Sequence, residues 1–215
     1  MISFYIIRHG ETLLNSLNRA QGWSDSPLPD NGEKAAKELG IKLKNITFSA
    51  AYTSDMLRAE QTAKLILSTK GNDDIKIQKD MRLREWCLGS MDAEHNTTFI
   101  QMVSDWLGGI TSFAELNRRL PDVAMAIYEH DTTGMAEPFT DIANRLNSVL
   151  VDIAHNKSLK ENSNILVVTH AFAIKTFLYL FAPEKLCTMD KLKNATILKL
   201  LYDGKSFLFE ETDFE

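Results

Sequence analysis

The chain has 215 residues, of which 44% are hydrophobic and 25% are charged, the composition of a globular protein with one domain of ordinary size. Aspartate and glutamate outnumber lysine and arginine by 29 to 24, and the formal charge of −5 argues against a nucleic-acid partner, which usually needs a basic face. A small anionic substrate is still allowed, because a few buried arginines can set the local field while distant surface charges are screened.

Two cysteines, Cys87 and Cys187, are too few for a disulfide framework, and no Cys/His spacing indicates a metal site. The first eight residues lack the basic start, apolar core and small-residue cleavage site of a signal peptide. The longest apolar stretch, residues 171–183, is interrupted by Lys175 and is too short to span a bilayer. We therefore expect a cytoplasmic protein with no membrane partner.

The predicted elements begin with a strand at residues 2–7, a continuous apolar run of the kind found in strands buried on both faces. A turn cluster then precedes a helix predicted at residues 33–43, where apolar residues share one face. A second strand is predicted at residues 48–53, and a helix should follow at residues 55–67 with Ser54 as its N-cap.

A short third strand is predicted at residues 75–78. Residues 93–138 contain glycines and a proline but no good strand, and they predict a mainly helical insertion over the edge of the sheet. An amphipathic helix is predicted at residues 139–153. Residues 164–169 form the clearest strand in the sequence, and a helix at residues 171–181 should follow it directly.

The last predicted elements are strands at residues 196–202 and 206–210, which Asp203 and Gly204 join into a hairpin. Strands alternating with helices indicate an α/β layered fold. Because no linker or internal repeat interrupts the chain, we expect a single domain over residues 1–215.

Polar residues follow the first predicted strand at the point where it ends. His9 lies where α/β sheets place their ligands, at the carboxyl end of a buried parallel strand. The adjacent Arg8 disfavours the imidazolium form, and a neutral imidazole is a nucleophile. Gly10 lets the backbone turn sharply. Taken alone, the segment is equally consistent with a strand that simply ends in polar residues.

Three other residues with useful chemistry lie at predicted strand ends. Arg58 lies in the first turns of a helix, where its guanidinium can bind two phosphate oxygens, although a helix arginine is usually solvated. His170 ends the clearest strand, and two strand-end histidines are hard to explain by core packing. Glu85 lies beside Trp86, and an apolar setting raises the pKa of a carboxyl group, although a loop glutamate is most often solvated.

Together these elements resemble the first branch of the histidine phosphatase superfamily, which contains cofactor-dependent phosphoglycerate mutase. The resemblance follows most of the chain in the right order. It rests on Arg8-His9-Gly10-Glu11-Thr12 with Asn15, on Gln21-Gly22-Trp23-Ser24-Asp25-Ser26-Pro27-Leu28 with Gly32, on Ser54, Arg58, Ala59 and Thr62, and on Val168-Thr169-His170.

The sequence departs from the family pattern at three places. Ala171 replaces the usual glycine after the second histidine, and Glu85 is followed by Trp86-Cys87-Leu88-Gly89 instead of phenylalanine-glycine. The usual Gly-Glu-Ser before the long C-terminal helix is represented by Ala136-Glu137-Pro138, with Arg145 further on.

The resemblance implies a three-layer α/β fold with a mostly parallel central sheet flanked by helices, and an insertion at residues 93–138 that caps the active site. It also implies that His9 attacks phosphorus and that water hydrolyses the resulting phosphohistidine, with no metal or other cofactor. Arg8, Arg58 and a protonated His170 would hold the phosphoryl oxygens.

Glu85 would protonate the leaving oxygen and then act as base for water. By the same resemblance, Asn15, Gln21 and the Gly22 backbone are candidate substrate contacts. The implied partner is a small phosphorylated metabolite, and the C-terminal hairpin allows a homodimer if it lies at a sheet edge.

We favour a phosphatase acting on small-molecule phosphate monoesters over two alternatives. In classical phosphoglycerate mutases the acid is followed by histidine-tyrosine-glycine, and the insertion is longer and bears arginines. Arg118 and Arg119 of this chain resemble those arginines only weakly. Members that have become non-catalytic binding modules generally lose the nucleophile or the acid, whereas His9 and Glu85 are both present here.

Overall fold

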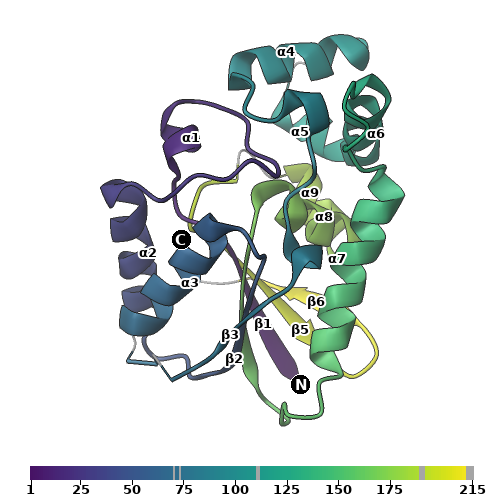
Figure 1. Cartoon of the computed structure of the whole chain (residues 1–215). Helices are drawn as coiled ribbons and strands as arrows, with labels where there is room; N and C mark the ends of the chain where they lie inside the picture. The colour runs from purple at the N-terminus through teal and green to yellow at the C-terminus, as the bar shows by residue number, and fades with distance from the viewer. Residues whose placement is uncertain (70, 73, 110–111, 189–191, 212–215) are drawn as a thin grey trace.

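The computed structural model describes residues 1–69, 71–72, 74–109, 112–188 and 192–211, and it is built on one six-stranded sheet (Figure 1). The strands lie in the order β3-β2-β4-β1-β5-β6. Their bounds are β1 Ile2–Arg8, β2 Phe48–Thr53, β3 Ile77–Lys79, β4 Asn164–Thr169, β5 Ile197–Tyr202 and β6 Phe207–Glu210. Strands β3, β2, β4 and β1 are parallel, and the β5–β6 hairpin adds an antiparallel edge. The predicted α/β class with a mostly parallel sheet is therefore confirmed.

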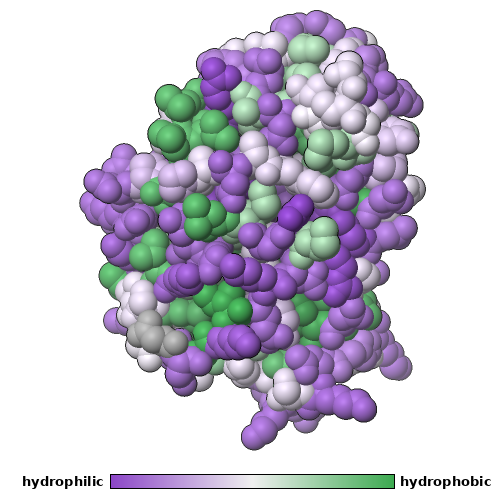
Figure 2. Space-filling model, in the orientation of Figure 1, coloured by the Kyte–Doolittle hydropathy of each residue, from purple (hydrophilic) through white to green (hydrophobic). Residues whose placement is uncertain are grey.

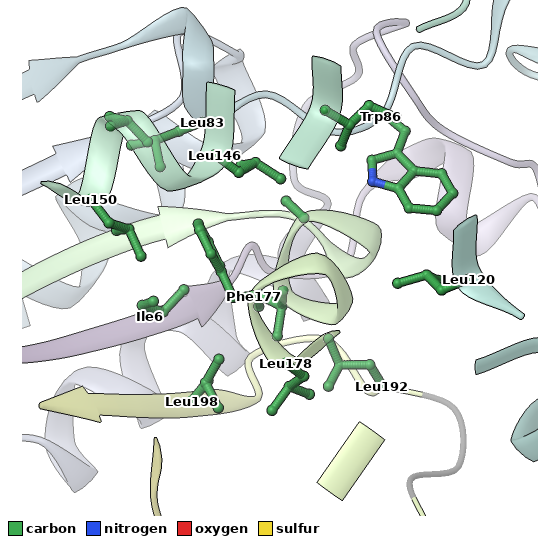
Figure 3. Close-up of a cluster of buried hydrophobic side chains, with 14 of the residues drawn as sticks. Ile6, Leu83, Trp86, Leu120, Leu146, Leu150, Phe177, Leu178, Leu192 and Leu198 are labelled. Atoms are coloured by element: carbon green, nitrogen blue, oxygen red, sulfur yellow. The ribbon is translucent and has the colours of Figure 1, made fainter. Parts of the chain in front are cut away.

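Helices cover both faces of this sheet, which makes three layers. Successive residues of β1 point to opposite faces: Tyr5 and Ile7 join the core under α2 (Asp30–Lys42) and α3 (Leu57–Thr69). Phe4 and Ile6 join the larger core on the other face, under α7 (Phe139–Ala154) and α8 (Ala171–Phe181). Figure 3 shows this larger core, in which Ile6, Leu146, Leu150, Phe177, Leu178 and Leu198 point toward one another.

The remaining helices lie toward the end of the sheet where the parallel strands finish (Figure 1). Residues 93–138 contain α4 (Asn96–Trp106), α5 (Phe113–Arg118) and α6 (Leu120–His130), and α5 packs on α9 (Pro183–Thr188). The short α1 (Leu13–Ser16) follows β1. This arrangement surrounds the carboxyl ends of β1 and β4 with loops and short helices.

Two predicted helix starts are wrong by a few residues. Helix α2 begins at Asp30 and not at residue 33, because Pro29 already adopts the extended conformation of an N-cap. Helix α3 begins at Leu57, and Ser54 does not cap it. The Ser54 hydroxyl instead lies 2.8 Å from His170 Nε2. The backbone amide of Leu57 donates to the side chain of Asp25, which lies in a loop distant in sequence.

The face in Figure 2 is mainly hydrophilic, and its hydrophobic residues gather in small groups. Among the residues that the structure describes, no helix has the length and apolarity needed to cross a membrane.

Candidate active site

The two predicted histidines meet at the carboxyl ends of neighbouring strands. Because β1 and β4 are paired in parallel, His9 and His170 leave the sheet side by side, with ring centroids 5.1 Å apart. The amide of His9 donates to the carbonyl of Thr169 at 3.0 Å, which extends the ladder to the nucleophile itself. Both side chains are buried. The sheet register thus fixes the distance between the two imidazoles.

The hydrogen bond of His9 defines its tautomer. Its Nδ1 lies 2.7 Å from the carbonyl oxygen of Gly10, and since a carbonyl only accepts, Nδ1 carries the proton. Burial, followed by the charges of Arg58 and Arg8, holds the pKa of His9 well below its usual range. Nε2 therefore keeps its lone pair at neutral pH, as a nucleophile requires.

The turn after His9 is held by contacts from distant segments. The amide of Gly10 donates to Thr62 Oγ1 at 2.9 Å, and Asn194 Nδ2 donates to the carbonyl of His9 at 3.1 Å. A Cβ on Gly32 would lie 2.0 Å from the carbonyl oxygen of Glu11, so only glycine allows this close backbone contact. Asn194 belongs to no motif in the sequence, and sequence reasoning missed it.

Arg58 is fully buried at the start of α3, and four contacts fix its guanidinium. Nε donates to His170 Nδ1 at 3.2 Å, and Nη2 donates to the carbonyl of Gly22 at 2.7 Å. Nη1 binds the carbonyl of Ser24 at 2.8 Å and the carboxylate of Asp25 at 3.0 Å. Of the five guanidinium N–H groups, these contacts with described residues leave one for a ligand.

The same contact corrects the expectation of a protonated His170. Its Nδ1 accepts from Arg58, so the proton of the neutral ring is on Nε2, which donates to Ser54 Oγ at 2.8 Å. Burial and the charge of Arg58 hold the pKa of His170 well below its usual range. His170 is therefore a neutral ring whose Nδ1 accepts from Arg58 and whose Nε2–H donates to Ser54.

Arg8 contributes a cation whose hydrogen bonds are incomplete. Nη1 donates to the carbonyl of Leu192 at 2.5 Å, but the buried Nε has no partner among the described residues. Burial lowers the pKa of Arg8 to about 10, so the side chain stays charged at neutral pH. A buried donor without an acceptor is costly, which makes Arg8 Nε a candidate donor to an anionic ligand.

Glu85 is buried against the N-terminus of α8. Its Oε2 accepts from the amide of Phe172, and its Oε1 accepts from the amides of Ala173 and Trp86, each at 3.0 Å. Burial raises the pKa of Glu85, while these three amides favour the carboxylate and oppose that rise. Ala171 is the first residue of this helix and has no positive φ, so the position does not need the family's glycine.

The predicted substrate contacts lie in α1, which contains Asn15, and in the loop after it, which contains Gln21 and Gly22. Asn15 Oδ1 accepts from Asn194 Nδ2 at 3.2 Å, and Gln21 Oε1 accepts from the Thr12 hydroxyl at 2.7 Å. The amide of Gly22 is already bound to Asp92 Oδ1 at 3.0 Å. The carbonyl of Gly22 accepts from Arg58 Nη2 at 2.7 Å, so both backbone groups of this candidate substrate contact have protein partners in the structure.

A lysine is also buried near this charge cluster. Lys175 Nζ donates to Asn117 Oδ1 of α5 at 2.7 Å, and burial lowers the pKa of Lys175 to about 8. The charges of Glu85 and Arg8 act on it in opposite directions. Sequence reasoning treated Lys175 only as an interruption of an apolar run, because nothing local shows that α5 covers it.

Lys175→Met is expected to change how stability depends on pH. Since the pKa of Lys175 is about 8 in the folded state and 10.5 in the unfolded chain, the unfolded chain binds more protons between these values. Wild-type stability therefore rises with pH there, by about 3 kcal/mol relative to the variant. Urea unfolding of both proteins at pH 7 and pH 10 measures the difference. A constant difference across this range would contradict the buried ammonium.

Within the part of the chain that the structure describes, no group of three or more histidine, cysteine, aspartate or glutamate side chains is arranged to hold a metal ion. Cys87, which is buried, and Cys187 are both free thiols.

Comparison with known proteins places this geometry in a family. The family model of the histidine phosphatase superfamily (branch 1) matches residues 4–213. The chain belongs to this superfamily branch. A probable phosphoglycerate mutase GpmB of Enterobacter sp. (strain 638) is 29% identical over 97% of the chain and 88% of its own length.

Two solved structures show the same architecture. A phosphoglycerate mutase from Bacillus anthracis str. Sterne is 32% identical, with a TM-score of 0.90 over 98% of this chain and 92% of that one. Bacillus stearothermophilus YhfR is 27% identical, with a TM-score of 0.76 over 97% of this chain and 95% of that one.

Proposed function

We propose that this branch 1 histidine phosphatase superfamily member is a metal-independent phosphatase that hydrolyses small-molecule phosphate monoesters. The observation that carries the proposal is the state of His9. Its Nδ1 proton is committed to the carbonyl of Gly10, and its Nε2 lone pair is available beside the partly buried Arg8 and the fully buried Arg58. A neutral nucleophile next to fixed cations is the arrangement that attack on a phosphate dianion requires.

The first step forms a phosphohistidine. His9 Nε2 attacks phosphorus in line, the P–O bond to the alcohol breaks, and Glu85 gives its proton to the departing oxygen. The phosphoryl oxygens are held by the unpartnered Nε of Arg8 and the remaining N–H of Arg58. The Nε2–H of His170 joins them by exchanging its Ser54 acceptor for a phosphoryl oxygen. The two arginine donors are oriented before substrate arrives, so little reorganisation of the guanidinium groups accompanies the chemistry.

The second step hydrolyses the intermediate. Glu85, now a carboxylate, takes a proton from water as the water oxygen attacks phosphorus, and the P–N bond breaks to return neutral His9 and free phosphate. Burial raises the pKa of Glu85, and a phosphate dianion raises it further, so both favour the protonated form that the first step requires. Once its proton has left with the alcohol, Glu85 is a carboxylate and can act as the base of the second step.

A phosphoglycerate mutase is the second candidate, favoured by the names of the relatives above. A mutase must hold a bisphosphorylated intermediate, which needs further cations around the leaving group. In the insertion, Arg118 is exposed, and Arg119 is bound to Asp122 at 2.9 Å and to the carbonyl of Leu107 at 2.9 Å. The exposure of Arg118 and the existing contacts of Arg119 favour hydrolysis over mutase activity. In this proposal residues 93–138 cap the active site and select the leaving group.

The proposal is tested with purified protein in the presence of a chelator. The substrates are p-nitrophenyl phosphate and a panel of metabolite phosphate esters, including 3-phosphoglycerate with and without 2,3-bisphosphoglycerate. We expect net phosphate release that the chelator does not reduce. Isomerisation of phosphoglycerate without net phosphate release would establish the mutase instead. Binding of phosphate with neither reaction would contradict the phosphatase and favour a binding module.

A further inference from the structure

One arginine and one glutamate form a clamp behind the loop that carries Glu85. Arg145 of α7 is only 14% exposed, and it donates through Nη1 to the carbonyls of Arg82 and Arg84 at 2.9 and 2.8 Å. Nη2 donates to the carbonyl of Glu85 at 2.8 Å. Two further bonds, from Nε and Nη2, reach the carboxylate of Glu137 at 2.7 and 2.8 Å.

Glu137 closes the clamp on the other side of the loop. Its Oε2 accepts from the amide of Cys87 at 3.2 Å, two residues after Glu85. The backbone of residues 85–88 lies outside helices and strands, so it has no regular ladder to fix it. The ion pair with Arg145 therefore supplies the anchoring that secondary structure would otherwise give.

These contacts also exclude a direct role for Arg145 in binding phosphate. A guanidinium has five N–H groups, and the three carbonyls and the Glu137 carboxylate account for all five. Arg145 differs in this respect from Arg8, whose buried Nε has no partner among the described residues. Its contacts are with the backbone on either side of the acid, not with the site of the phosphoryl group.

We propose that Arg145 and Glu137 are positioning residues that hold the Glu85 carboxyl group against the N-terminus of α8, in place to protonate the leaving group. This inference rests on the proposed phosphatase function. A general acid must lie within hydrogen-bond reach of the oxygen it protonates. A displacement of about 1 Å can cost a factor on the order of 10² in rate, so the loop needs a rigid support. Helix α7 supplies one.

The test compares two leaving groups. An alkoxide needs a proton as it departs, whereas p-nitrophenolate departs readily without one. Arg145→Met should lower kcat/KM by about 10- to 100-fold for the alkyl phosphate that the wild type hydrolyses best. For p-nitrophenyl phosphate the same variant should lose less than about threefold, because this ester depends little on general acid catalysis.

Two variants calibrate this result. Glu85→Gln removes the acid itself and should show the same selectivity to a greater degree. Lys199→Met is the matched control, because Lys199 is 19% exposed and forms an ion pair with Glu210 at 2.6 Å in the β5–β6 hairpin. It should leave the ratio of the two activities unchanged. Thermal unfolding of each variant separates a loss of fold from a loss of positioning.

A readout without turnover tests the clamp independently. In a ¹³C NMR titration of glutamate carboxyl groups, with Glu85 assigned through Glu85→Gln, Arg145→Met should raise the pKa of Glu85, because amide bonds that favour the carboxylate are weakened. Equal losses for both esters with an unmoved Glu85 titration would overturn the inference while the phosphatase stands. A wild type without turnover would refute the phosphatase, and the titration would still decide whether the clamp positions Glu85.

Discussion

Replacement of His9 by alanine is expected to reduce phosphate release by a factor on the order of 10⁴ or more, because the covalent route is lost with the nucleophile. The loss should appear for every ester that the wild type hydrolyses, alkyl or aryl, since every leaving group is displaced by in-line attack of His9 on phosphorus. This uniform loss differs from the selective loss expected when only the acid is displaced.

The phosphoenzyme itself gives a second measurement. Wild type mixed briefly with ³²P-labelled substrate and quenched in alkaline detergent should retain label on His9, because phosphohistidine survives alkali and is destroyed by acid. His155→Ala is the control, since His155 ends α7 and contacts Val151 and Tyr202. Label that persists in His9→Ala, or near-normal turnover by that variant, would contradict the assigned nucleophile.

The sequence predicts the sheet and the two histidines because both depend on local pattern. Continuous apolar runs identify β1 and β4, and in a parallel sheet the residues that follow two neighbouring strands must lie at one edge. His9 and His170 could therefore be placed together before any contact was known. The motif spacing adds Arg58 and Glu85, whose positions depend on the turns that follow β2 and β3.

The partners of these residues could not be predicted in the same way. Asn194 reaches the carbonyl of His9 across 185 residues of sequence, and Asp92 binds the amide of Gly22 across 70. Neither follows a strand or repeats at a helical spacing, so no periodic pattern indicates them. The neutral state of His170 likewise follows from the direction of Arg58 Nε, which is a matter of tertiary packing.

Arg58→Met is expected to damage both activity and stability. It removes one phosphate donor outright and frees the loop that Arg58 fixes through Gly22 and Ser24, so kcat/KM should fall by a factor on the order of 10³. Removing one partner of a buried ion pair typically costs about 3 kcal/mol or more, although Asp25, at 28% exposed, can recover some solvation. Arg58→Lys should restore part of the stability and little of the activity, because an ammonium cannot reproduce the fork.

The titration of His170 separates this effect from general loosening of the fold. The charge of Arg58 is one of the causes that lower the pKa of His170, and its Nε–H occupies Nδ1. In Arg58→Met the pKa of His170 should rise toward its usual value, which ¹H NMR of the imidazole protons detects. Arg119→Met, which breaks an ion pair with Asp122 in the insertion, should leave it unchanged. If His170 titrates alike in both variants, Arg58 does not hold that ring neutral, and the donor role assigned to its Nε2–H loses its support.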